Sequence, residues 1–84
     1  KLIDDLSRKI IKEFINEYEN LSTVSKETLE PIIKSLISKH KTNFKGVGQP
    51  LRIALVGSRF GPGLYDVIMS LDKSTILSRL KALS

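Results

Sequence analysis

Residues 49–66, QPLRIALVGSRFGPGLYD, form the stretch around which the rest of the chain is organised. Its apolar first part predicts a helix that ends at Gly57, and Pro62 favours the start of a second helix with Gly61 as its cap. Such a short connection makes the two helices neighbours and exposes the turn between them, which carries Arg59 and Phe60. The turn is therefore the first candidate for a functional site.

Apolar residues recur at intervals of three and four on both sides of this stretch, as in helices that bury one face. The spacing predicts a first helix over residues 2–20, a second from about Lys26 to Lys41 with Ser25 as its N-cap, and a last one capped by Asp72. No alternating strand pattern, internal repeat or low-complexity tract occurs in the sequence. The predicted fold class is all-α, a small bundle of about five helices.

Two prolines fall inside predicted helices, where a proline costs about 3 kcal/mol if the turn stays regular. At Pro31, either the first turn is distorted or the helix proper starts at the proline, and we favour a kinked helix that begins near Lys26. Apolar spacing before Pro50 lets the third helix begin near Lys45, whereas a stricter interpretation starts it at Pro50.

Length and composition restrict the possible classes. The 84 residues make one small domain at most, and the missing initiator Met suggests a part of a longer chain. Without Cys and with His40 as its one histidine, the chain has no basis for a disulfide framework, a metal site or a His cluster. The longest apolar run, residues 53–56, is far shorter than the roughly 20 residues of a spanning helix, so we expect a soluble cytoplasmic protein without a membrane partner.

The net charge of +5 is unevenly distributed. Residues 1–42 hold 8 Lys/Arg and 7 Asp/Glu, whereas residues 43–84 hold 6 Lys/Arg and 2 Asp/Glu. This excess surrounds a turn rich in Gly and Pro, which suggests an anionic partner there. Ordinary solubilising charge is the alternative.

No catalytic arrangement is evident. The segment from Gly57 to Gly63 lacks the Lys-Ser/Thr pair of a phosphate-binding loop and does not follow a strand. His40 lies at the end of the second helix with no suitable partner near it in sequence, so we assign it a capping or solvated role. The acidic residues of the first two helices, such as Glu13 and Glu17, are interpreted as solvated faces.

What remains is a basic, partly aromatic turn on a helical scaffold. Proteins bind single-stranded nucleic acid with cationic side chains, stacking planes and exposed backbone groups. Arg52, Arg59, Phe60 and Tyr65, with the open backbone of residues 61–63, supply all three. Each also has a simpler role: Arg52 as a surface charge, Phe60 as an anchor beneath the turn, and Tyr65 as a core residue.

The same residues carry a family resemblance. Gln49-Pro50-Leu51-Arg52, then Ala54-Leu55, Gly57 and Pro62-Gly63-Leu64-Tyr65-Asp66, followed by a leucine-rich helix, resemble the C-terminal anticodon-binding domain of bacterial-type glutamyl-tRNA synthetases. The match covers residues 43–84 closely and residues 21–42 more loosely. It also favours the longer third helix, from about Lys45 to Val56.

The resemblance implies a set of contacts to tRNA. Arg52, Gly61, Pro62, Leu64 and Tyr65 are expected to contact the wobble and middle bases of the anticodon. Lys45 and Arg59 are candidates for phosphate contacts. Gly61 stands where the family commonly has Ser or Thr, so a hydroxyl contact is lost there, and Asp72 replaces a usual Gly.

The resemblance also implies a parent enzyme and a domain division. The parent would be a glutamate–tRNA ligase that uses ATP and Mg²⁺ in an upstream catalytic domain, while this part binds no cofactor. Residues 1–22 are expected to belong to the end of a preceding helical subdomain, and residues 23–84 to the anticodon-binding domain. The alternative function is a helical protein-interaction module whose broad first-helix stripe, around Ile10 and Phe14, docks a partner without RNA binding.

Overall fold

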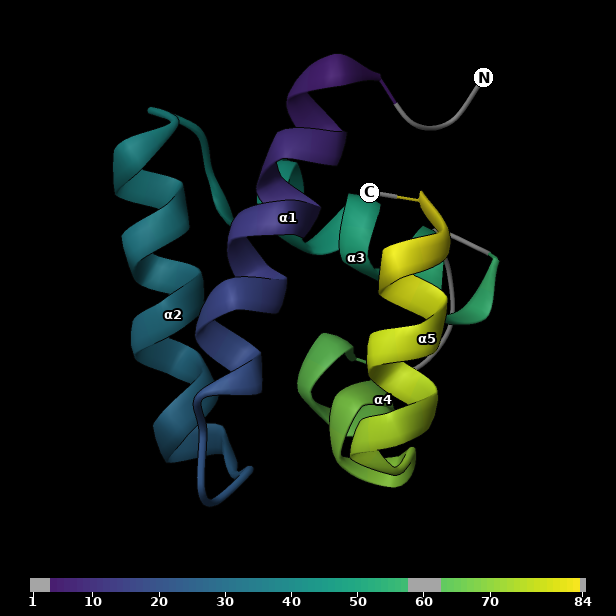
Figure 1. Cartoon of the computed structure of the whole chain (residues 1–84). Helices are drawn as coiled ribbons and strands as arrows, with labels where there is room; N and C mark the ends of the chain where they lie inside the picture. Colours follow the sequence, from purple (N-terminus) through teal and green to yellow (C-terminus); the bar gives the residue numbers. More distant parts are fainter. Residues whose placement is uncertain (1–3, 58–62, 84) are drawn as a thin grey trace.

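The computed structural model describes residues 4–57 and 63–83, and these form a bundle of five helices (Figure 1). The helices are α1 (Asp5–Glu19), α2 (Lys26–Lys39), α3 (Phe44–Val56), α4 (Leu64–Ser70) and α5 (Lys73–Leu83). The all-α prediction is confirmed. None of the helices in these two ranges is long and apolar enough to cross a bilayer.

Helices α1 and α2 lie side by side and antiparallel, with α3 behind them and α5 on the other side of α1 (Figure 1). One core joins all five helices. Its fully or nearly fully buried members are Ile10, Ile11, Phe14, Ile15, Tyr18, Leu29, Ile32, Ile33, Leu36, Val47, Leu51, Leu55, Leu64, Val67, Ile68, Ile76 and Leu80.

The apolar stripe of α1 is buried within this bundle. Its five core side chains are at most 6% exposed, and α1 packs against α2, α3 and α5. The rings of Phe14 and Tyr18 stack with centroids 5.5 Å apart. The chain's own helices thus cover the stripe from Ile10 to Tyr18, whereas Leu6 in the first turn of α1 is 48% exposed. The division of the chain at residue 22 stays a prediction.

Polar side chains accept hydrogen bonds from free backbone N–H groups at the starts of α1, α2, α3 and α5. The sequence predicts two of these caps, those of α2 and α5. Ser25 and Thr28 form a reciprocal capping box at α2, and Asp72 accepts from the Thr75 N–H at α5. Asp4 and Asn43 do the same for α1 and α3. These bonds are local in sequence, which is why residue type and position alone indicate them.

The helices α2 and α3 both continue through their prolines. α2 begins at Lys26 and contains Pro31, as predicted. α3 begins at Phe44 and contains Pro50, so the interpretation that starts it at Pro50 is wrong. The reason is that Asn43 caps the helix six residues before Gln49 would, with its side chain bonded to the Gly46 N–H at 2.9 Å. Gly57 ends α3 in the left-handed conformation (φ +73°), as expected.

The fourth helix starts later than the sequence suggests. α4 begins at Leu64, and Gly63 occupies the N-cap position with ψ 154°, which is extended and not helical. The prediction that Pro62 is the first helical residue is therefore wrong. Gly61 and Pro62 themselves lie outside the described residues.

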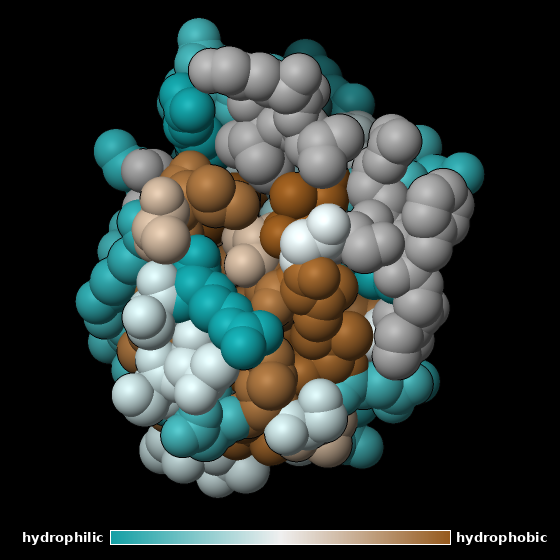
Figure 2. Space-filling model, turned by 90° about the vertical axis from the view of Figure 1, so that its right-hand side faces the viewer, coloured by the Kyte–Doolittle hydropathy of each residue, from teal (hydrophilic) through white to brown (hydrophobic). Residues whose placement is uncertain are grey.

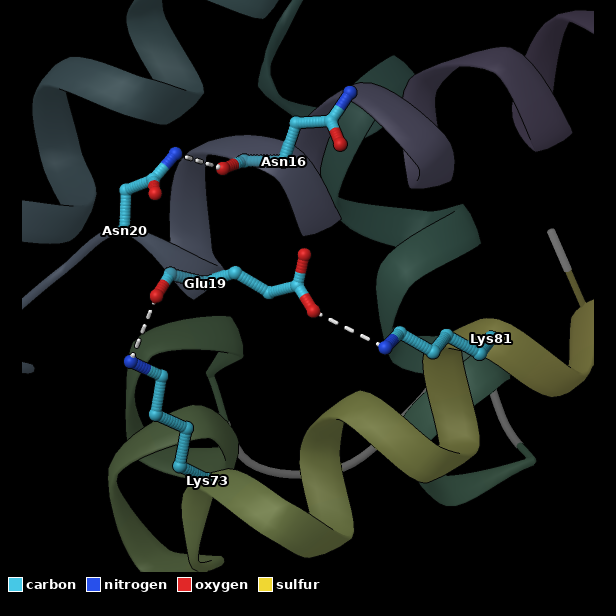
Figure 3. A network of polar contacts seen from close by, with 5 residues as sticks. All are labelled: Asn16, Glu19, Asn20, Lys73 and Lys81. Carbon is cyan, nitrogen blue, oxygen red and sulfur yellow. Dashed lines mark hydrogen bonds and ion pairs between the residues drawn. The ribbon is translucent and has the colours of Figure 1, made fainter.

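Lysines of α5 connect it to the end of α1 (Figure 3). The Lys73 ammonium donates to the carbonyls of Glu19 and Leu21 at 3.2 and 2.8 Å and lies 5.6 Å from the centre of the Tyr18 ring. Lys81 pairs with the Glu19 carboxylate at 3.1 Å. On the side of the bundle where α5 lies, apolar side chains gather into a patch bordered by polar groups (Figure 2).

Candidate nucleic-acid interface

A pocket of about 260 Å³ lies where the first two turns of α3 meet the start of α4. It is lined by Phe44, Lys45, Gly48, Gln49, Arg52, Gly63 and Leu64. Residues four apart in a helix share a face, so Phe44, Gly48 and Arg52 follow one line along α3, with Lys45 and Gln49 beside it. Helix periodicity therefore brings the Phe44 ring, the two basic side chains and the Gln49 amide to the same side of α3.

Gly48 keeps this pocket open. A Cβ atom at Gly48 would lie 3.4 Å from the Phe44 ring and 3.7 Å from a Leu64 methyl group. Any larger side chain would occupy the space between these two residues. The Gly48 backbone is itself buried, so the missing side chain leaves a space about the size of a methyl group beside the Phe44 ring and the Leu64 side chain.

Arg52 is the chemically unusual group of the pocket. Its Nε and Nη2 atoms are buried and have no hydrogen-bond partner in the part of the chain that the structure describes. A buried donor without a partner costs about 1–3 kcal/mol. An acceptor that enters the pocket and pairs with the guanidinium would relieve this cost, which makes Arg52 suited to a ligand with acceptor atoms.

Aromatic residues extend the pocket toward α2. The rings of Phe44 and Tyr65 lie 6.1 Å apart at an angle of 49°, and the Lys26 ammonium lies 5.9 Å from the centre of the Tyr65 ring. Burial raises the pKa of the Tyr65 phenol, and the nearby Glu30 carboxylate raises it further. Tyr65 is therefore neutral at pH 7, so it does not repel an anionic ligand.

The structure brings together three of the residues predicted for the site and places a fourth beside them. Arg52, Leu64 and Lys45 line one pocket, and Tyr65 adjoins it through Phe44. Leu64 is only 2% exposed, so its main role is to anchor α4. Arg52 is not a simple surface charge, whereas Tyr65 does pack in part against the core.

The other predicted residues lie outside the described residues. These are Gly61 and Pro62, predicted for base contacts, Arg59, predicted for phosphate contacts, and Phe60.

Three pocket residues were missed by the sequence analysis: Phe44, Gly48 and Gln49. Phe44 shares the helical spacing of the apolar residues Val47 and Leu51, which are fully buried, but it is itself 46% exposed. As the first residue of α3 it has no preceding turn to pack against. Counting back from Arg52 in steps of four would have found Gly48 and Phe44.

A larger pocket, of about 330 Å³, lies between α1 and α2 and includes Glu13, Glu17 and Lys39. Its carboxylates disfavour an anionic ligand. At its edge, the Glu13 carboxylate accepts a 2.8 Å hydrogen bond from His40 Nε2 and pairs with Lys39 at 3.2 Å. His40 occupies the C-cap position of α2, as predicted, and its partner comes from another helix, so the interpretation of Glu13 as merely solvated is wrong.

A pocket that contains Lys45, two buried Arg52 nitrogens without a described partner and an aromatic flank fits a nucleic-acid ligand. A family model described as an anticodon binding domain matches residues 1–84. The chain belongs to the anticodon binding domain family. This match includes α1 as well as the helices that build the pocket.

Relatives of this anticodon binding domain are glutamate–tRNA ligases. The ligase of Pelagibacter ubique is 60% identical over 80 residues, which are 95% of this chain and 17% of that protein. Those of Desulfitobacterium hafniense and Methylacidiphilum infernorum are 34% and 35% identical over 71 and 78 residues, 84% and 93% of this chain. The chain covers 14% and 18% of these two proteins, so it corresponds to a small part of each relative.

Proposed function

We propose that this chain is the part of a glutamate–tRNA ligase that binds the tRNA anticodon, and that the pocket between α3 and α4 contacts the wobble and middle bases. The observation that carries the proposal is the 60% identity to a glutamate–tRNA ligase over nearly the whole chain, together with the anticodon binding domain match. The pocket adds a physical reason, because it combines donors, positive charge and rings.

In this proposal Arg52 is the central contact. Its unpaired donors are suited to acceptor atoms on a base edge, and a planar guanidinium can make two parallel hydrogen bonds. Lys45 is exposed beside it and can neutralise a phosphate. Gly61, Pro62 and Arg59 follow directly in the chain before α4 and complete the proposed contact set with Leu64 and Tyr65.

Catalysis is assigned to the rest of the parent protein. An upstream domain would activate glutamate with ATP and Mg²⁺ and transfer it to tRNA in the cytoplasm, while this domain would help to select the tRNA. The proposal assigns no catalytic residue, cofactor or metal to the 84 residues. Its support is the size of the relatives, of which this chain covers less than a fifth.

The alternative function, a protein-interaction module that uses the α1 stripe, has little support. Ile10 and Phe14 of that stripe are at most 1% exposed and belong to the core. A partner could reach them only if the bundle opened. Substituting Lys at either position would therefore unfold the domain instead of removing a docking surface.

Fluorescence anisotropy with a labelled glutamate anticodon stem-loop tests the proposal. Arg52→Ala should weaken binding by about tenfold or more, since one bidentate contact discriminates by about 1–3 kcal/mol. The unfolding temperature should stay the same or rise, because the substitution removes two buried unpaired donors. Wild-type binding should fall with salt, with a log–log slope of about −0.7 per phosphate contact.

The control is Arg8→Ala, which removes the same charge from α1, where Arg8 is half exposed and pairs with Asp5 at 3.9 Å. Stem-loops with the wobble or middle base changed measure base selection. The proposal is wrong if wild type binds these as well as the original stem-loop, or if Arg8→Ala weakens binding as much as Arg52→Ala.

A further inference from the structure

Phe44 is an exposed ring at the edge of the pocket between α3 and α4. It is 46% exposed although it belongs to the apolar spacing of α3, and it lines the pocket that contains Arg52. One edge of its ring lies 3.4 Å from the position that a Cβ atom of Gly48 would take. An exposed ring and two buried guanidinium nitrogens that have no partner among the described residues therefore share a single pocket.

The surface continues from Phe44 in one direction. Tyr65 follows at 6.1 Å, and the Lys26 ammonium lies 5.9 Å from the centre of the Tyr65 ring. Lys26 is exposed at the start of α2, so its charge is open to solvent. Along this surface the Arg52 guanidinium is followed by the two aromatic rings and then by the Lys26 ammonium. Groups that can bind a base are thus followed, at one end, by a group that can bind a phosphate.

We propose that the Phe44 ring is the stacking surface for one unpaired base whose edge meets Arg52 and Gln49, and that Lys26 binds a phosphate of the adjoining nucleotide. This inference rests on the proposed function and extends it to three residues outside the expected contact set. A ring stacks on any base, whereas a guanidinium and an amide select acceptor and donor positions. Phe44 therefore contributes affinity, and Arg52 contributes base selection.

The size of the pocket agrees with one base. About 260 Å³ is slightly below the range of about 300–1,000 Å³ that is typical of sites for whole small-molecule ligands. The nucleotide's sugar and phosphate would remain outside, where Lys45 and Lys26 are exposed. A single-stranded loop can offer a base in this way, since its bases are not held in a duplex.

The test compares Phe44→Leu, which keeps an apolar side chain, with Phe44→Tyr, which keeps the ring. Anisotropy with the anticodon stem-loop should give about 5- to 150-fold weaker binding for Phe44→Leu, the range of one base–aromatic stack, and binding within about twofold of wild type for Phe44→Tyr. Met69→Ala is the control, because Met69 is 53% exposed on α4 and does not line the pocket. The affinity of Met69→Ala for the stem-loop should equal that of wild type.

A second measurement identifies the stacked base. With 2-aminopurine placed at each loop position in turn, wild type should quench the fluorescence at one position, and Phe44→Leu should abolish that quenching. Discrimination against changed bases should survive in Phe44→Leu and disappear in Arg52→Ala. Lys26→Ala should make the log–log salt slope shallower by about 0.7, whereas Phe44→Leu should leave the slope unchanged.

The outcomes separate the two claims. If Arg52→Ala loses binding while Phe44→Leu binds as wild type does, the stacking role is overturned and the proposed function stands. If Met69→Ala weakens binding as much as Phe44→Leu, the stacking role is also overturned. If wild type does not prefer the glutamate anticodon stem-loop to its base-changed forms, the proposed function fails and this inference fails with it.

Discussion

The Arg79 guanidinium on α5 donates a hydrogen bond to the Leu55 carbonyl at the end of α3, with 2.6 Å between Nη1 and the oxygen. Leu55 belongs to the last turn of α3, whose carbonyls have no partner within the helix. A cation at this end also interacts favourably with the helix dipole. Arg79 therefore ties α5 to the helix that carries the pocket.

Arg79→Ala should destabilise the domain by about 1–2 kcal/mol, since it removes a charged donor from a helix terminus. In a domain of this size, thermal unfolding followed by circular dichroism should shift down by about 4–8 °C per kcal/mol. Arg8→Ala is the matched control, because its exposed pair with Asp5 is worth little. Equal shifts for the two variants would contradict the capping role of Arg79.

The contact between Glu13 and His40 should make stability depend on pH in the acidic range. The hydrogen bond from His40, followed by the interaction with Lys39, lowers the pKa of Glu13 below its ordinary value of 4.5. A carboxyl whose pKa is lower in the folded state stabilises the fold fully above about pH 4.5. That contribution is lost as the pH falls through the lowered pKa.

Glu13→Gln should therefore lower the free energy of unfolding by up to about 1 kcal/mol at pH 7. This difference from wild type should vanish at pH values below the lowered pKa of Glu13. Urea unfolding at a series of pH values measures it. Glu17→Gln removes the same charge from the same helix and should have the smaller effect at pH 7. A Glu13→Gln deficit that stays constant down to low pH would be inconsistent with the carboxylate as its source.

Local signals explain how much of this fold the sequence reveals. Ser25, Asp72 and Gly57 act through backbone groups within four residues of themselves, so their positions indicate helix ends directly. The pair formed by Glu13 and His40 joins residues 27 apart, and its existence depends on how α1 and α2 align. A local sequence pattern carries no information about how these two helices align.

The candidate site, too, could be predicted only in part, because some of its features depend on how the helices pack. Arg52 was identified through the family resemblance, and the helix through Pro50 puts Lys45 on the same face. Phe44 was not predicted for the site, because its apolar spacing indicates only a helix, and the structure places it, as the first residue of α3, at the edge of the core. Only the packing of α4 against α3 reveals that this edge borders a pocket.

Two lysines of α5 should contribute unequally to stability, although both reach Glu19 (Figure 3). Lys73 donates to two carbonyls at the end of α1, where no helical partner exists, so Lys73→Met should cost about 1–2 kcal/mol. Lys81 and Glu19 form an ion pair in which both side chains are largely exposed, so Lys81→Met should cost less than about 0.5 kcal/mol. Urea unfolding of both variants measures the difference, and a larger loss for Lys81→Met would refute this ranking.

Gly48→Ala should separate RNA binding from stability. Alanine is favoured over glycine inside a helix by up to about 1 kcal/mol, and the new methyl group meets the Phe44 ring at 3.4 Å, so the unfolding temperature should change little or rise. The same methyl group occupies the space between Phe44 and Leu64, so the dissociation constant for the anticodon stem-loop should rise about tenfold, or roughly 1.4 kcal/mol. Ala54→Ser adds one atom to α3 outside the pocket and should leave binding unchanged. Tight binding by Gly48→Ala would mean that the base does not enter the space beside Phe44 and Leu64.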